Sequence, residues 1–204
     1  MTIQLPNDLL LDNDFWQFSL SLWQNKKAQA VLLRLQNEHA LRVNLLLFSM
    51  WLALEKKDIN LYILTALKRT ESWHQEVVMP LRSVRQTLPS HTPIPSLKPQ
   101  VQASELLAEQ IEQSLLYQCS RSTASPHNMM TNCAKSTLSI LVKNILACSL
   151  HSQTIAQMDA DEVHQNKKFD TVSTSDLLLL VQACLPLHPA AEISACIESL
   201  TKPQ

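Results

Sequence analysis

Residues Val43–Lys57 read VNLLLFSMWLALEKK, and Ser49 is the only polar residue between Leu45 and Leu54. A helix of this composition has no polar stripe for solvent, so it needs cover on every side. The run is also shorter than the about 20 apolar residues that cross a bilayer. We therefore predict that residues 44–57 form a buried central helix surrounded by other helices of the same chain.

The chain contains no glycine among its 204 residues, although average usage is about 7%. Tight hairpins and turns with positive φ must then be built without the residue that suits them best. Glycine-rich phosphate loops and the dinucleotide fingerprint are excluded for the same reason. With 46% hydrophobic and 17% charged residues, the sequence predicts an all-α protein. We expect an irregular bundle of about eight helices around the central one.

The net charge limits the kinds of partner that the chain is expected to bind, and the cysteine pattern indicates its location in the cell. A formal net charge of −1 gives no global field for nucleic acid or an anionic membrane, and we expect no nucleic-acid binding. The five cysteines include no Cys-x-x-Cys pair, and the first residues lack a signal-peptide pattern. These features predict reduced thiols, a cytoplasmic location and no transmembrane segment.

Amphipathic segments on both sides are predicted to cover the central run. Residues 15–23 follow a capping Asp-Asn-Asp sequence. Residues 26–38 place four apolar side chains on one face, namely Ala28, Val31, Leu32 and Leu35. Asn44 is a candidate N-cap of the central helix, and Asp58 of a helix over residues 59–69.

Pro80 interrupts the next helical stretch, residues 71–88, because proline cannot donate to the carbonyl of Glu76. We expect a kink or two short helices end to end. The side chains predicted to face inward are Trp73, Val77, Leu81, Val84 and Leu88. Residues 89–101 contain four prolines and are predicted to be a linker. The chain then divides into a helical core at 14–88 and a second helical layer at 102–201.

The second layer is predicted to contain helices at 102–119, 132–151 and 176–185, and a last one opened by Pro189. Ser175 or Thr174 is the expected cap of the third. In the first of these helices, Leu106, Ile111, Leu115 and Cys119 form the apolar face, with Glu105, Glu109 and Glu112 exposed. Whether this layer packs on the core or forms a separate unit stays open.

Four blocks of sequence occur in a fixed order: FWxFSLxLW from Phe15, LxLQ from Leu33, VNLLLFxxW from Val43 and WxxEVVxPLRxxR from Trp73. Together they resemble a bacterial family of small helical proteins known only as a domain of unknown function. The resemblance spans residues 14–88 and implies an all-helical, cytoplasmic protein without a known activity. Members commonly have glycine near Ala40 and an acidic residue where this chain has Arg42.

Polar or amphipathic side chains within otherwise apolar segments are the candidate binding residues: Asn44, Trp51, Trp73, Glu76, Arg82 and Arg85. Arg82 and Arg85 lie one turn apart and form a fork suited to a carboxylate or phosphate. The alternative, which we favour, is that Arg82 or Arg85 pairs with Glu76 or caps carbonyls freed by Pro80, while Asn44 caps its helix.

Spacings typical of metal or catalytic sites are weak. Glu71-x-x-His74 and Asp161-x-x-His164 have the spacing used in di-iron bundles, but no further glutamates are placed with them. Cysteines and histidines in residues 119–133 match no standard zinc motif. We therefore expect no metal, no cofactor and no catalytic residue, which favours a non-enzymatic protein.

Two functional classes follow. The leading one is an interaction or adaptor protein that binds a protein partner or self-associates through leftover apolar surface. The alternative is a small-molecule or lipid-binding bundle, with or without enzymatic activity. Its pocket would be lined by Trp16, Trp51 and Trp73, and a small anionic ligand would be held by Arg82 and Arg85.

Overall fold

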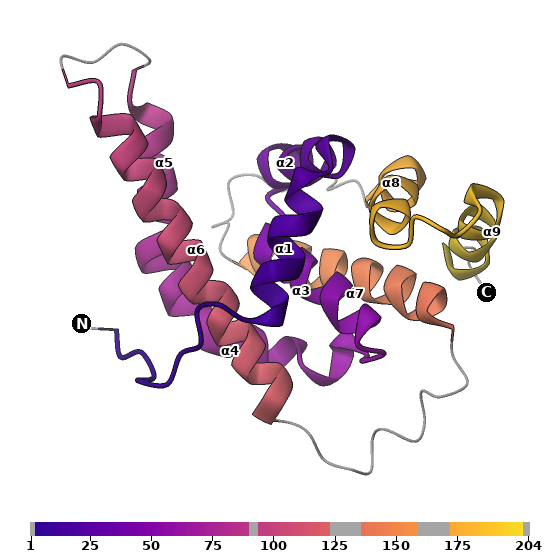
Figure 1. Ribbon diagram of the computed structural model, residues 1–204. Helices are drawn as coiled ribbons and strands as arrows, with labels where there is room; N and C mark the ends of the chain where they lie inside the picture. The colour runs from indigo at the N-terminus through magenta and orange to yellow at the C-terminus, as the bar shows by residue number, and fades with distance from the viewer. Residues whose placement is uncertain (1–2, 90–93, 123–135, 159–171, 202–204) are drawn as a thin grey trace.

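The computed structural model describes residues 3–89, 94–122, 136–158 and 172–201. Within these ranges every regular element is a helix, which confirms the predicted all-α class (Figure 1). None of the helices in the described ranges has both the length and the apolar character that a membrane crossing requires.

Helix α3 (Val43–Leu54) is the predicted central helix, and every residue from Val43 to Ala53 is buried. It contacts α1 (Asp14–Gln24), α2 (Lys26–His39), α6 (Leu97–Ser122) and α7 (Thr137–Met158). The prediction of a helix covered on all sides is therefore confirmed, although the helix ends at Leu54 rather than at Lys57.

Aromatic rings hold α3 against its neighbours. The Phe15 ring of α1 lies 5.5 Å from both Phe48 and Trp51 of α3, measured between ring centroids. The Trp51 ring lies 5.6 Å from Tyr117 of α6. Tilted aromatic pairs at these distances are favourable beyond the apolar area that they bury. Trp51 is thus part of the core.

Asn144 of α7 forms hydrogen bonds with the backbone in α3 and just after it. Its Nδ2 donates to the carbonyls of Ser49 and Lys57, each at 3.0 Å, and its Oδ1 accepts from the Ile59 amide at 3.0 Å. The bonds to Lys57 and Ile59 satisfy backbone groups outside α3, and the bond to Ser49 ties α7 to the helix itself. Beyond them Asp58 caps the short 3₁₀ helix Ile59–Leu61, close to the predicted capping role.

The two N-terminal helices are confirmed, the first with its predicted cap and the second with a cap, Asn25, that was not predicted. Asn13 accepts from the Trp16 amide at the start of α1, and Asn25 accepts from two amides at the start of α2. The four residues predicted to face inward on α2 are all buried. Helix α2 ends at His39 and is followed by Ala40, whose φ of 54° is left-handed. Glycine is the usual residue for this conformation, so a chain without glycine holds an alanine in a strained position.

The segment around Pro80 differs from the predicted kink. Helix α4 (Ile63–Trp73) continues into a π-helical turn, His74–Val78, and then into α5 (Met79–Thr87). Because Pro80 has no amide hydrogen, one α-helical bond is lost, and the widened turn bonds the Met79 amide to the His74 carbonyl. The predicted break at residue 70 is wrong, since α4 runs through it. Val84 was expected to face inward but is 47% exposed.

The orientation of α6 is the largest departure from the sequence prediction. Glu105 and Glu112 were expected to be exposed and are buried, whereas Leu106 and Leu107 are 51% and 59% exposed. Helix α6 lies beside α4 and α5 (Figure 1), and Arg82 and Arg85 of α5 donate to its glutamates. The helix also begins at Leu97, within the predicted linker, so Pro99 occupies its first turn, where proline is tolerated.

The last three helices pack on the other side of α3. Helix α7 buries Leu138, Leu141, Val142 and Ile145. Helix α8 (Thr174–Cys184) contacts α2 and is joined to it by an Arg34–Asp176 ion pair, and α9 (Ala190–Thr201) contacts α7 and α8. The cap of α8 is Ser173 rather than Ser175 or Thr174, because the Ser173 side chain accepts from the Asp176 amide.

Candidate functional site

The buried face of α6 carries a row of carboxylates. Glu105, Glu109 and Glu112 are spaced four and three residues apart, which places them on one face of the helix. That face lies against α4 and α5. The carboxylates therefore meet the arginines that the sequence singled out.

Arg82 and Arg85 form the predicted fork, and the carboxylate in it is Glu105. Arg82 Nε donates to Glu105 at 3.1 Å and Arg82 Nη2 to Glu109 at 2.5 Å. Arg85 donates to Glu105 through Nε and, at 3.2 Å, through Nη2. The expected partner Glu76 is exposed in the π-helical turn, so the favoured pairing with Glu76 is wrong. An external anion would have to displace Glu105.

Burial and charge affect the two carboxylates in opposite ways. Burial alone raises the pKa of Glu105, but hydrogen bonds from Arg85 and Arg82 outweigh it and hold the pKa below its ordinary value. Burial also raises the pKa of Glu109, and there the attraction of Arg82 does not compensate. Glu109 is thus paired with less positive charge than Glu105 is.

Glu112 lies deeper and is only 1% exposed. Its Oε1 accepts from Arg42 at 2.6 Å and lies 3.0 Å from His74 Nδ1. Arg42 also donates to Thr70 at 2.9 Å and to Glu71 at 2.8 Å. Burial would raise the pKa of Glu112, but contacts with His74 and then Arg42 bring it down to about 2. The carboxylate is therefore ionised and held by several partners at once.

Asn44 belongs to this buried network and bonds two residues of α6 instead of capping its own helix. Its Nδ2 donates to Glu112 at 2.6 Å, and its Oδ1 accepts from Gln113 Nε2 at 3.0 Å. Arg42 occupies the N-cap position of α3 without a capping side-chain bond. The predicted capping role of Asn44 is therefore wrong, and its place as a polar residue of a candidate site is a consequence of α6 packing.

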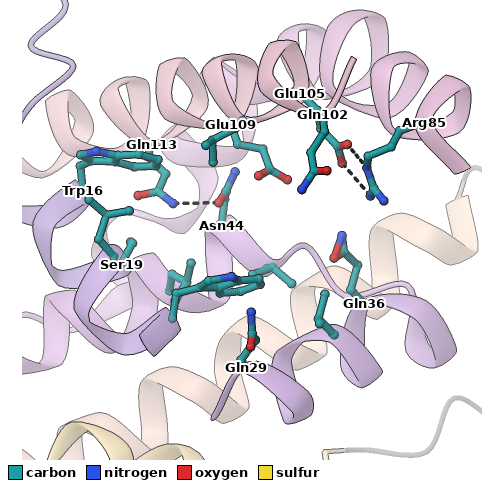
Figure 2. Close-up of a pocket in the computed structure, with 16 residues that line it drawn as sticks. Trp16, Ser19, Gln29, Gln36, Asn44, Arg85, Gln102, Glu105, Glu109 and Gln113 are labelled. Carbon is teal, nitrogen blue, oxygen red and sulfur yellow. Dashed lines mark hydrogen bonds and ion pairs between the residues drawn. The ribbon is translucent and has the colours of Figure 1, made fainter. Parts of the chain in front are cut away.

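A pocket of about 470 Å³ opens between α1, α2 and α6 (Figure 2). One part of its wall is apolar: Trp16, Leu20, Trp23, Leu33, Val43, Leu47 and Leu106. The other part is polar and rich in amides: Ser19, Gln29, Gln36, Asn44, Arg85, Gln102, Glu105, Glu109 and Gln113. Pockets with apolar walls and a few converging polar groups are typical ligand sites.

Gln113 lines the pocket with one side-chain atom paired and one unpaired. The residue is 3% exposed, and its Oε1 atom receives no hydrogen bond from the part of the chain that the structure describes. Figure 2 shows Gln113 reaching from α6 between Trp16 and Asn44. An unpaired buried acceptor carries a desolvation penalty of about 1–3 kcal/mol.

The predicted site residues are only partly brought together. Arg85 and Asn44 line the pocket, and Trp16 of the predicted aromatic wall does so too. Trp51 lies in the core, and Trp73 donates from Nε1 to the Ala108 carbonyl at 2.9 Å, between α4 and α6. Trp51 and Trp73 thus have structural roles.

No cluster of His, Cys, Asp and Glu suited to a metal was found among the described residues. Glu71 and His74 of the first Glu-x-x-His spacing each contact the buried network instead. The second spacing, Asp161-x-x-His164, and most of the cysteine and histidine segment 119–133 lie outside the described residues.

Sequence reasoning missed the acidic face of α6, together with Gln113 and His74. The available signal was the matching periodicity of three glutamates on one segment and of Arg82 and Arg85 on the preceding one. Opposite charges with helical spacing on consecutive helices favour a packed pair, with the charges between the helices.

These features define an all-helical protein with a buried ionic network beside an amphipathic pocket. Residues 14–116 match the family described as "Protein of unknown function (DUF2390)", and the chain belongs to that family. The match includes α1 to α5 and most of α6, and hence the pocket and the network. Comparisons with curated proteins and with solved structures returned no match.

Proposed function

We propose that this protein binds a small organic molecule in the pocket between α1, α2 and α6. The observation that carries the proposal is a pocket in which an extended apolar wall faces the carboxylate of Glu109, whose side chain is 26% exposed. A ligand with an apolar body and a polar head would remove apolar surface from water and pair this carboxylate at the same time. The cytoplasmic location, expected from the scattered cysteines, stays part of the proposal.

The geometry favours binding over chemistry at this site. The lining carboxylate Glu105 is bound by two guanidinium groups, and Asn44 is committed to Glu112 and Gln113. Groups held this firmly are suited to orienting a ligand. This supports the non-enzymatic part of the sequence prediction.

A second candidate is the interaction or adaptor protein. It is favoured by the leucines around the pocket, because Leu20, Leu33 and Leu106 are all exposed and line it. Exposed apolar side chains that gather at one place are typical of contact surfaces. A partner segment would then insert an apolar side chain where the small molecule is proposed to sit.

Native mass spectrometry of the purified protein tests both candidates. We expect a small bound mass that is retained by the wild type and lost from Leu20→Trp, in which a larger side chain occupies the pocket. The matched control is Leu187→Trp, since Leu187 is 95% exposed and lies in the α8–α9 connection. A stoichiometric protein partner without a small bound mass would favour the second candidate. A bound mass that Leu20→Trp retains would show that the ligand is elsewhere.

A further inference from the structure

The charges around the pocket suggest which ligand it takes. Arg82 divides its donors between Glu105 and Glu109, and Glu105 also holds Arg85. Glu109 therefore receives one hydrogen bond, at Oε1, and its Oε2 receives none from the described residues. Glu109 also lines the pocket, and Figure 2 shows its carboxylate directed from α6 toward Asn44. The carboxylate has an acceptor left over at the pocket wall.

Glu109 is the acceptor that a ligand in this pocket can reach. Its side chain is 26% exposed, whereas the Gln113 Oε1 atom is fully buried, and Asn44 lies between the two side chains (Figure 2). An ammonium group has three donors and no acceptor, so it is suited to the open carboxylate oxygen of Glu109.

The apolar wall is suited to the same ligand. The indole rings of Trp16 and Trp23 line the pocket, and an indole face attracts a cation more strongly than other aromatic rings do. An anion would meet Glu105 and Glu109, and Arg85, the lining cation, is already bonded twice to Glu105. The pocket therefore discriminates in favour of positive charge.

Resting on the proposed function, we propose that the ligand is an organic amine. Its ammonium group donates to Glu109, and its apolar body lies against Trp16 and Trp23. The raised pKa of Glu109, caused first by burial, agrees with a carboxylate that lacks a full counter-charge. A bound ammonium supplies that charge.

Three probes of nearly equal shape test the proposal: phenylbutylamine, phenylbutanol and phenylbutyrate. Binding to the full chain is measured by titration calorimetry at neutral pH, together with tryptophan fluorescence. A charge-assisted hydrogen bond to the half-buried carboxylate of Glu109 predicts that the amine binds at least about tenfold more tightly than the alcohol. Phenylbutyrate is expected to bind more weakly than both.

Glu109→Gln keeps the side-chain shape and removes the charge, so the amine should then bind no better than the alcohol. Glu55→Gln, at an exposed position after α3, is the matched control and should keep the preference. Circular dichroism checks that each variant is folded.

The outcomes separate the two proposals. If the alcohol binds and the amine binds no more tightly, or if phenylbutyrate binds best, the amine proposal is wrong and the pocket proposal stands. If Glu109→Gln keeps the wild-type preference for the amine, the amine proposal is also wrong. If none of the three probes binds, both the amine proposal and the pocket proposal are wrong.

Discussion

At the scale of single residues, the ion pair of Arg42 and Glu112 explains how charged groups are tolerated in this core. Both side chains are at least nine-tenths buried. Removing two charges from water costs several kcal/mol, and their attraction offsets this only when further hydrogen bonds satisfy both groups. Asn44, Thr70 and His74 provide those contacts. The network is therefore sensitive to the loss of any one member.

Glu112 should make the stability of the protein depend on acid pH. Its folded pKa of about 2 is below the ordinary value of 4.5. The stabilisation is therefore present above pH 4.5 and is lost as the pH falls toward 2. The expected loss is about 3 kcal/mol. Urea unfolding at a series of pH values measures it.

Glu112→Gln is the variant that isolates this effect. At neutral pH it should be less stable by about 3 kcal/mol, because Arg42 stays buried with part of its counter-charge removed. On acidification it should lose less stability than the wild type. Some dependence remains, since the pKa values of Glu105 and Asp176 are also lowered. A variant profile parallel to the wild-type profile would contradict the assignment of an ionised, paired Glu112.

At the scale of elements, the end of α2 shows how a chain without glycine terminates a helix. Ala40 takes the left-handed conformation, and the amides of Ala40 and Leu41 both bond to the Leu35 carbonyl. Lys56, after α3, has a similar φ of 56°. In both cases the surrounding contacts hold a side-chain-bearing residue where glycine is ordinarily favoured.

Ala40→Gly should raise the free energy of unfolding by about 1 kcal/mol, because it removes the clash of Cβ in the left-handed region. Ala30→Gly provides the matched control. Ala30 is exposed within the same helix, and the same substitution there should lower stability by about 1 kcal/mol. Urea midpoints of the two variants should thus move in opposite directions. A loss of stability in both would show that Ala40 is not strained.

At the scale of the whole molecule, α3 connects both halves of the chain. Helices α1 and α2 from the first half of the chain contact it, and so do α6 and α7 from the second half. Helix α8 is further tied to α2 through Arg34 and Asp176. Because both halves contribute to this core, we expect residues 14–88 and 102–201, the two layers predicted from the sequence, to fold together.

Equilibrium unfolding by two probes tests this prediction. All four tryptophans lie in the first 73 residues, so their fluorescence reports on the first half, whereas far-ultraviolet circular dichroism reports on all helices. Cooperative folding predicts coincident urea transitions by the two methods. If helical signal persisted after the fluorescence transition, the second layer would be an independent unit.

The central helix and its nearest neighbours were predictable from the sequence. A run without a polar stripe can be satisfied only in the interior, so Val43–Leu54 had to be buried. The caps Asn13 and Asn25 and the inward face of α2 follow from local rules of hydrogen bonding and period. Such features are independent of partners far away in the chain.

The orientation of α6 was not predictable in this way, and the pocket depends on it. The helix has leucines on two faces, and local pattern assigns its glutamates to solvent. Burial of those glutamates becomes favourable only when they pair with arginines that lie 20 to 70 residues earlier in the chain. The sequence by itself therefore determined the class of fold and its buried helix. Packing of distant segments determined which face of α6 points inward, because the free energy of a buried charge depends on the partner it meets.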